Sequence, residues 1–236
     1  MRSFVILAAL CLALLFAVVA VQAKPAAGKP SLKAVFTAEF EFAQGTVPQP
    51  KKGQTSGDPP RKLPKIPGEG KVYYSNPKLR IDFKQGLTNE ETRLIADFST
   101  KKAVVLYPDT LNGYRIDMAS LDTRGYLPAL QGFMNGGEMP TPDGFKKKTV
   151  GKEKIAGKSA THYRLEKTGG GSTIDYWLGA GDRPLKLTAK TSHGTLTINV
   201  TEFVRGASVV PDLFTINGSY QIEEVEELPQ GPVPGI

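Results

Sequence analysis

Apolar and polar residues alternate along much of this chain, and the alternation predicts β-strands. Within residues 32–42 every second side chain is apolar, and Phe36, Phe40 and Phe42 fall on one side, opposite lysine, threonine and glutamate. Successive side chains of a strand point to opposite faces, so this pattern describes a strand with one buried face. The same alternation returns in three runs between residues 172 and 203, which predict an antiparallel meander with one apolar side.

Further strands are expected wherever alternating runs flank turn residues. Hairpins are predicted at residues 69–84 and 146–166, and strands at 92–98, 103–107 and 114–118. A sheet with one apolar side needs cover, and curling on itself supplies part of it. The expected fold class is therefore mainly β: a single strongly curved antiparallel sheet of about ten strands, forming an open half-barrel.

The hydrophobic period changes to a helical one in the middle of the chain. Leu127, Leu130 and Met134 recur at helical spacing, Pro128 suits a first turn, and Gly136 suits an end. We expect a short helix at 127–135, one of one or two that close the mouth of the sheet. It could serve as a movable lid or as a fixed part of the core, and the sequence leaves both open.

Three segments lie outside the predicted sheet. Residues 1–23 have one early arginine, a charge-free apolar run and a small-residue ending, which indicate a secretory signal peptide; the alternative is a membrane anchor. The remainder divides into a single half-barrel domain at 24–222, with a basic Pro-rich loop at 46–68, and an acidic Pro-rich tail at 223–236. After signal cleavage we expect no transmembrane segment, and a secreted protein that is extracellular, or periplasmic if bacterial.

The basic loop is a candidate contact with an anionic surface, although a solvated linker has the same composition. Its cations are Lys51, Lys52, Arg61, Lys62 and Lys65. The chain carries a net charge of +7 at pH 7, without the clustered arginines and aromatics of a nucleic-acid site, so we expect no nucleic-acid partner.

Candidate chemistry is sparse. Cys11, the single cysteine, lies in the expected signal peptide, and His162 and His193 have no neighbouring motif that marks a base or a ligand. We therefore predict no enzyme, no catalytic residue, no metal and no cofactor. Asn199 and Asn217 each begin an Asn-X-Ser/Thr sequon, so both are expected glycosylation sites if the source is a eukaryote.

Four segments carry a resemblance to a known family. They are GKVYYSNPKLRIDF at 70–83, VGKEKIAGKSATHYRLEK at 150–167, YWLGAGDRPLKLTAKT at 176–191 and PDLFTINGSY at 211–220. With them the chain resembles the lipoprotein-carrier (periplasmic lipoprotein localisation factor) half-barrel superfamily. The resemblance implies an apolar cavity for acyl chains, with Arg80 matched to the carriers' basic cavity residue. The whole chain also resembles secreted marine-invertebrate proteins of the kind described as development-specific in sea urchin gut.

The sequence thus predicts a secreted, non-enzymatic binding protein that shelters a lipid or other apolar ligand against the curved sheet. The alternative is an extracellular structural or cell-surface interaction protein with a developmental role and no small-molecule ligand. The predicted ligand-lining residues are Phe36, Phe40, Phe42, Tyr74, Ile81, Phe83, Leu130 and Phe133.

Overall fold

The computed structural model describes residues 31–43, 65–121, 141, 144–192 and 194–228 of the 236-residue chain. Twelve strands within these ranges form one sheet. In chain order the strands are β1 (Ser31–Phe42), β2 (Ile66–Ser75), β3 (Lys78–Gln85), β4 (Glu91–Asp97), β5 (Lys102–Tyr107), β6 (Asn112–Asp117), β7 (Phe145–Ile155), β8 (Lys158–Lys167), β9 (Thr173–Gly179), β10 (Arg183–Thr191), β11 (Gly194–Arg205) and β12 (Gln221–Glu224). The helical elements are α2 (Met118–Leu121), η1 (Ala180–Asp182) and η2 (Pro211–Phe214).

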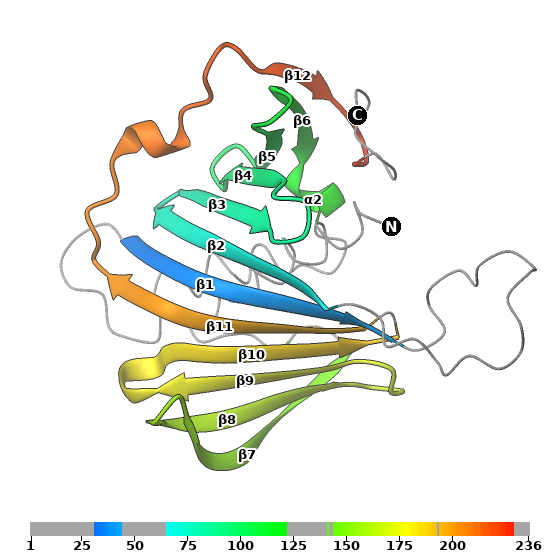
Figure 1. The fold of residues 1–236 in the computed structure, drawn as a ribbon, viewed down its shortest axis with the longest axis vertical. Coiled ribbons are helices and arrows are strands. Elements are labelled where there is room, and N and C mark those ends of the chain that lie inside the picture. The colour runs from blue at the N-terminus through cyan, green and yellow to red at the C-terminus, as the bar shows by residue number, and fades with distance from the viewer. Residues whose placement is uncertain (1–30, 44–64, 122–140, 142–143, 193, 229–236) are drawn as a thin grey trace, which may run out of the picture.

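The sheet consists of two meanders joined by the N-terminal strand. Its order is β12-β6-β5-β4-β3-β2-β1-β11-β10-β9-β8-β7, so β1 lies between β2 and the much later β11 (Figure 1). Neighbouring strands in the described part of the chain run antiparallel, apart from the parallel pair β6 and β12. The predicted mainly β, single-sheet fold is confirmed, with twelve strands in place of about ten.

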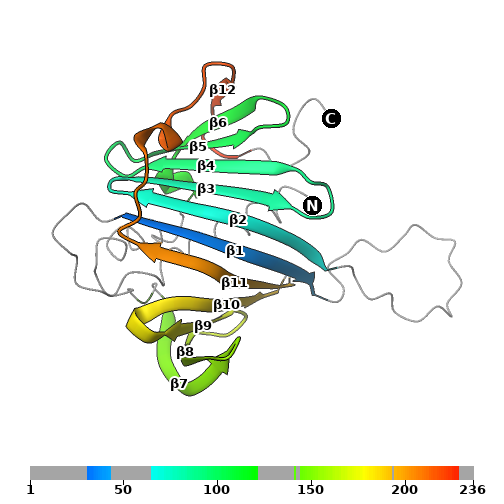
Figure 2. The ribbon, with the colours of Figure 1, turned by 60° about the vertical axis from the view of Figure 1, so that its left-hand side comes forward.

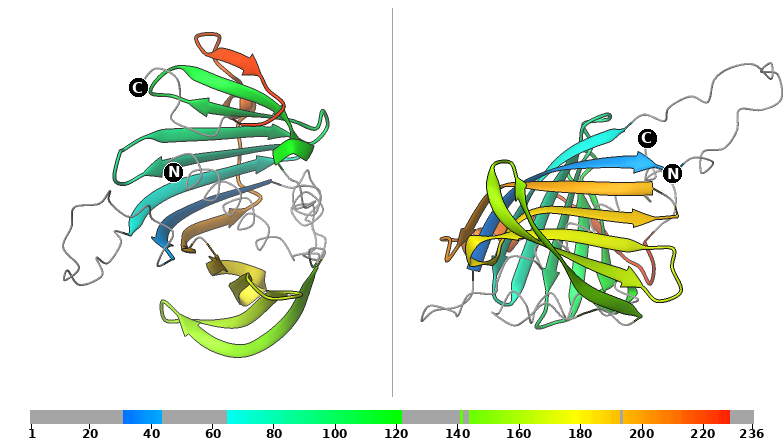
Figure 3. Two further views of the ribbon diagram at one scale, coloured as in Figure 1. Left: turned by 90° about the vertical axis from the view of Figure 1, so that its right-hand side faces the viewer. Right: turned by 90° about the horizontal axis from the view of Figure 1, so that it is seen from below.

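The sheet is bent and does not close into a barrel. β12 and β7 lie at its two ends, as Figures 2 and 3 show from different sides. Register shifts interrupt the ladders at Val35/Phe36, at Thr149/Gly151 and at Pro184/Lys186. Such irregularities bend a strand and increase its local twist, which accounts for part of the curvature. The predicted open half-barrel is therefore confirmed.

We call the face that bears Phe36, Ile81 and Leu187 the inner face, and the opposite one the outer face. The inner-face side chains form one apolar cluster that extends from β6 through β1 to β8. Ile81 and Leu187 are fully buried in it, and Phe36 is 2% exposed. Complete burial of a side chain of this size contributes about 1.5–3 kcal/mol, so this cluster is the main source of stability.

The outer face is partly covered by the segment that connects β11 to β12. Phe214, in η2, is buried in a second apolar cluster with Ile95, Val104 and Leu106. Arg80 fixes this crossing, because its Nη1 donates a hydrogen bond to the Leu213 carbonyl at 2.8 Å.

The position of Arg80 corrects one implication of the family resemblance. The residue lies on the outer face, and its Nη2 is 2.8 Å from the Asp82 carboxylate. Arg80 alternates along β3 with Leu79 and Ile81, which belong to the inner cluster, so its side chain cannot share their face. Arg80 is therefore not a basic residue of the inner face.

Two segment boundaries differ from the sequence prediction. β2 begins at Ile66, inside the expected loop at 46–68, because Ile66 pairs with Phe40 and packs on the inner cluster. β12 crosses the expected start of the tail at residue 223, and Val225 and Leu228 also pack on that cluster. The expected signal peptide and the helix at 127–135 lie outside the described residues, in which we find no helix with the length and hydrophobicity of a membrane span.

The hydrogen bonds of Asp97, at the turn between β4 and β5, are expected to make the stability of the fold depend on pH. Burial raises the pKa of Asp97, but hydrogen bonds from the Ser99 hydroxyl and from the Ser99 and Thr100 amides outweigh burial, so the folded-state pKa is lowered. This stabilisation is complete above the unfolded value of about 4 and is lost as the pH falls through the folded value. Between neutral and acidic pH, the wild type should lose about 1 kcal/mol more stability than Asp97→Asn, because the variant has no carboxylate to protonate at this position. Urea unfolding at neutral and acidic pH measures the free energy of unfolding of both proteins. The same dependence on pH in the two proteins would contradict the prediction.

Candidate functional site

Six of the eight predicted ligand-lining residues lie together on the inner face. Phe36, Phe40, Tyr74, Ile81 and Phe83 are buried there, on β1, β2 and β3, and Phe42 packs against them partly buried. Leu130 and Phe133 lie outside the described residues.

The aromatic rings of this group are in mutual contact across β1 and β3. The Phe36 and Phe83 rings stack at 6.4 Å with an interplanar angle of 14°, and Phe40 meets Phe42 edge to face at 4.9 Å. The intervening strand, β2, places Gly70 beneath the Phe36 ring, where a Cβ would come within 2.2 Å of the ring. Glycine in a strand marks such a close approach, so the sequence of β2 makes room for the rings.

The inner face is also a region of low polarity. Across β5, β4, β3, β2 and β1 its side chains include no charged group. Burial raises the pKa of Tyr74 well above its ordinary value, and burial followed by the nearby Tyr114 raises the pKa of Tyr107. Burial raises the pKa of a phenol because the surrounding side chains solvate the charged phenolate poorly. This surface suits hydrocarbon and disfavours ions.

One cation is in register with the inner-face residues at the C-terminal end of β11. Arg205 pairs in register with Leu32, its guanidinium is 5.5 Å from the centre of the Phe203 ring, and its Nη1 donates to the Gly181 carbonyl at 3.0 Å. Burial lowers its pKa, with Asp182 acting in the opposite direction. Sequence reasoning missed this residue, because the register shift that changes its face becomes visible only in the paired strands.

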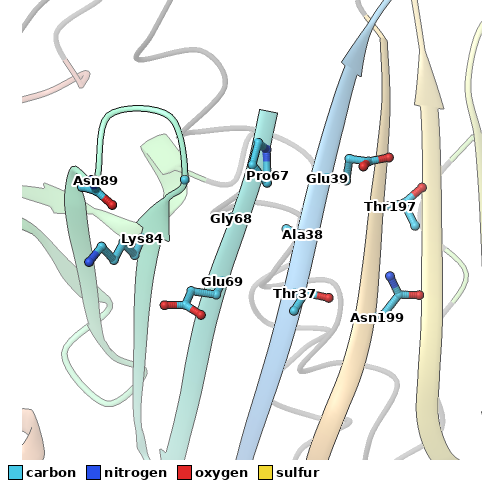
Figure 4. A pocket seen from close by; sticks show the side chains of 11 residues that line it. Thr37, Ala38, Glu39, Pro67, Gly68, Glu69, Lys84, Asn89, Thr197 and Asn199 are labelled. Atoms are coloured by element: carbon cyan, nitrogen blue, oxygen red, sulfur yellow. The ribbon is translucent and has the colours of Figure 1, made fainter. Parts of the chain in front are cut away.

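The described residues also line two grooves, both on the outer face. The larger has a volume of about 510 Å³ and is lined mainly by polar side chains of four adjacent strands, including Thr37, Glu39, Glu69, Lys84 and Asn199 (Figure 4). A second groove of about 340 Å³ adjoins it over β2, β3 and β4. Both grooves are lined mainly by polar side chains of the outer face, so neither is the apolar site predicted to hold a lipid.

Of the five cations predicted to contact an anionic surface, the structure describes Lys65. Its Nζ is 2.7 Å from Glu39 and 3.8 Å from Glu41, and the hydrogen bond to Glu39 raises its pKa. The lysine is therefore already paired within the fold. Lys51, Lys52, Arg61 and Lys62 lie outside the described residues.

Both sequon asparagines are on the surface. Asn199 is exposed on the outer face and lines the larger groove. Asn217 is exposed in the turn before β12, where its Oδ1 accepts a hydrogen bond from the Ser219 amide at 3.2 Å. Glycosylation at these positions stays a prediction.

A polar cluster on the outer face of β7, β8 and β9 was not anticipated. His162 is buried, with Nε2 2.6 Å from Asp175 and Nδ1 3.0 Å from Glu153, and it stacks on Trp177 at 4.4 Å. Arg164 Nε also donates to Asp175, at 2.6 Å. These contacts bind three strands together.

The cluster gives no sign of catalytic or metal chemistry. Its carboxylates are already engaged by His162, Arg164 and the Trp177 indole, whose Nε1 donates to Glu153. In the part of the chain that the structure describes, no three His, Cys, Asp or Glu side chains converge as a metal site requires. We interpret the cluster as a structural network.

Comparisons with known proteins give structural neighbours and no family. No family model and no curated protein matches the chain. An uncharacterised conserved protein from Thermus thermophilus is 11% identical, with 81% of this chain and 91% of that one covered and a TM-score of 0.49. A LolA superfamily protein from Nitrosomonas europaea is 8% identical (86% and 96% covered, TM-score 0.39). A putative outer membrane lipoprotein-sorting protein domain from Vibrio parahaemolyticus is 11% identical (80% and 90% covered, TM-score 0.37).

Two of these neighbours bear names of the carrier superfamily that the sequence resembles, whereas the resemblance to invertebrate proteins gains no support. All three TM-scores lie below 0.5, so no conclusion about the function of this chain rests on these likenesses.

Proposed function

We propose that this protein is a non-enzymatic binding protein whose inner face shelters an apolar ligand, with a lipid acyl chain as the favoured class. The observation that carries the proposal is the apolar cluster on the inner face of β1–β5, in which Phe36 stacks on Phe83 and Phe40 meets Phe42 edge to face. Ligand sites of this class are concave and mostly apolar, with few polar groups. These side chains lie on the inner face of a sheet that is bent and not closed into a barrel (Figure 3).

Hydrocarbon binding to this face has a clear energetic basis. Each methylene removed from water contributes about 0.8 kcal/mol, so burial of about ten methylenes matches the roughly 8 kcal/mol of micromolar affinity, before the entropic cost of binding. The raised pKa values of the buried Tyr74 and the partly buried Tyr107 support an environment in which a carboxylate or phosphate headgroup would stay outside. The favoured ligand therefore has a long apolar part and a headgroup at the rim.

The test uses adjacent residues of β1 that point to opposite faces. We expect the full chain to bind a fluorescent fatty acid saturably, and Ala38→Trp to weaken that binding at least tenfold, because the new ring displaces two or more methylenes from the inner face. Thr37→Trp should leave binding unchanged, since Thr37 is exposed and alternates along β1 with the inner-face residues Phe36 and Ala38. Ala38→Leu is the milder variant if tryptophan prevents folding, with circular dichroism as the folding check.

Three outcomes would contradict the proposal. They are no uptake by the folded wild-type chain, equal uptake by Ala38→Trp, and a loss of uptake with Thr37→Trp alone. The last result would indicate that the ligand binds in the polar outer groove, whose lining does not suit an acyl chain.

A further inference from the structure

The positive charge of this protein is concentrated at one end of the sheet. Residues 145–167, which form the β7–β8 hairpin, contain seven lysines and one arginine against two glutamates, a net charge of +6 compared with +7 for the whole chain. β7 is the last strand in the sheet order, so one of its edges has no neighbouring strand among the described residues.

The lysines are accessible and surround this edge. Lys146 and Lys148 of β7 point to the outer face. Lys152 and Lys154 lie on the same strand beyond the register shift, and Lys158 is the first residue of β8, beside the turn. All five lysines are exposed. Lys148 pairs with Glu166 at 2.6 Å, and Glu153 is engaged by His162. Within the described part of the chain, Lys152, Lys154 and Lys158 form no ion pair.

The opposite end of the sheet carries the opposite charge. Residues 221–228, which include β12, contain four glutamates and no basic residue. β12 and β7 are the two terminal strands of the sheet and lie at opposite ends of the molecule in Figure 1. This separation gives the protein an electric polarity along the strand order, which would orient it with the β7 end toward a negatively charged partner.

We propose that the β7–β8 hairpin is a docking edge for an anionic lipid surface. Lysines that point to both sides of a strand and to its tip match a diffuse negative surface better than a single pocket, because a lysine ammonium is a flexible point charge. Val150, which is 48% exposed between Lys148 and Lys152, adds an apolar side chain that suits a bilayer interface. Glu153 of β7 contacts His162 on β8 and accepts a hydrogen bond from Trp177 on β9, which ties β7 to the sheet behind it.

An acidic extended peptide is the rival occupant, because an edge strand can pair with another chain. The structure favours the lipid surface for two reasons. The register shift at Thr149/Gly151 interrupts the ladder that an added strand would continue, and lysines on an edge are a common protection against strand pairing. The proposal does not depend on the inner-face ligand, since the hairpin charges and the β1–β5 rings belong to different strands.

The test is co-sedimentation of the full chain with vesicles of phosphatidylcholine that contain about one third phosphatidylglycerol, compared with vesicles of phosphatidylcholine alone. We expect binding to the anionic vesicles only, falling as salt is added. The triple variant Lys152→Gln, Lys154→Gln and Lys158→Gln should bind about a hundred-fold more weakly, because each lysine near an anionic membrane is worth about 1 kcal/mol.

The matched control removes the same charge elsewhere. Lys71→Gln, Lys101→Gln and Lys190→Gln alter three exposed lysines outside the hairpin and should change binding less than about threefold. Equal loss in both triple variants, equal binding to neutral vesicles, or tighter binding to a poly-glutamate peptide than to the anionic vesicles would overturn the proposal. Fatty-acid uptake should be the same in the hairpin variant and in the wild type, so failure of the docking edge and failure of the inner-face ligand give different results.

Discussion

Replacing Gly70 with alanine is expected to destabilise the protein by about 3 kcal/mol, at the upper end of the usual cost of overpacking. A Cβ at this position would lie 2.2 Å from Phe36 Cζ and 2.8 Å from the Asp82 carbonyl oxygen. The Phe36 ring cannot retreat freely, because it is 2% exposed and stacked on Phe83. Backbone and ring would both have to move, and well-packed cores resist this. Urea unfolding measures the change in the free energy of unfolding.

A control and a double-mutant cycle identify the cause. Gly218→Ala adds the same methyl group where nothing lies within 4 Å of the new Cβ, so it should be neutral within about 0.5 kcal/mol. Phe36→Ala alone should cost about 3–5 kcal/mol. The double variant Phe36→Ala with Gly70→Ala should cost at least about 1 kcal/mol less than the sum of the single changes, since the clash has been removed. Strict additivity would show that the ring does not require the glycine.

Removing the Asp175 carboxylate should cost about 2 kcal/mol, because one side chain serves two donors. Asp175 is 14% exposed and lies 2.6 Å from both His162 Nε2 and Arg164 Nε. In Asp175→Ala the buried imidazole keeps the Glu153 contact and the stack on Trp177, but its Nε2 loses its partner, and Arg164 loses the same carboxylate. Since the cluster joins β7, β8 and β9, the loss should appear first as faster hydrogen exchange of the amides paired between β8 and β9.

Glu166→Ala is the matched control for this prediction. Glu166 also pairs across the β7–β8 hairpin, with Lys148 at 2.6 Å, but both side chains are exposed, and such pairs contribute little. We expect a change below about 1 kcal/mol for Glu166→Ala. Asp175→Asn, which keeps the size and one acceptor, should fall between wild type and Asp175→Ala. Equal effects of Asp175→Ala and Glu166→Ala would show that burial of the network adds no stability.

Strand existence and strand faces were the part of the fold that the sequence predicted well. The expected strand at 32–42 is β1 almost to the residue, and the expected hairpin turn near Gly157 lies between β7 and β8. There Ala156 and Gly157 have φ of 48° and 77°, as a two-residue hairpin turn requires. The candidate inner-face residues also follow from alternation, since Phe36, Phe40 and Ile81 share one face in the folded chain.

Other features could not be obtained from alternation. The sequence does not say that β1 lies between β2 and β11, because pairing of strands so distant in the chain depends on packing of the whole sheet. His162 looked isolated because Glu153 and Asp175 reach it only across strand pairs. The basic charge of the hairpin could be recognised from composition. Its position at the end of the sheet, opposite the acidic end, requires the order of the described strands.

The sequence by itself determined that this protein is a β-sheet with one continuous apolar face, because side-chain alternation is a local property of each strand. The tertiary structure decided the order of the strands, the paired environment of Lys65 and His162, the outer grooves and the separation of charge between the two ends. These features depend on contacts between residues that are far apart in the chain, and local periodicity carries no information about which strand lies beside which.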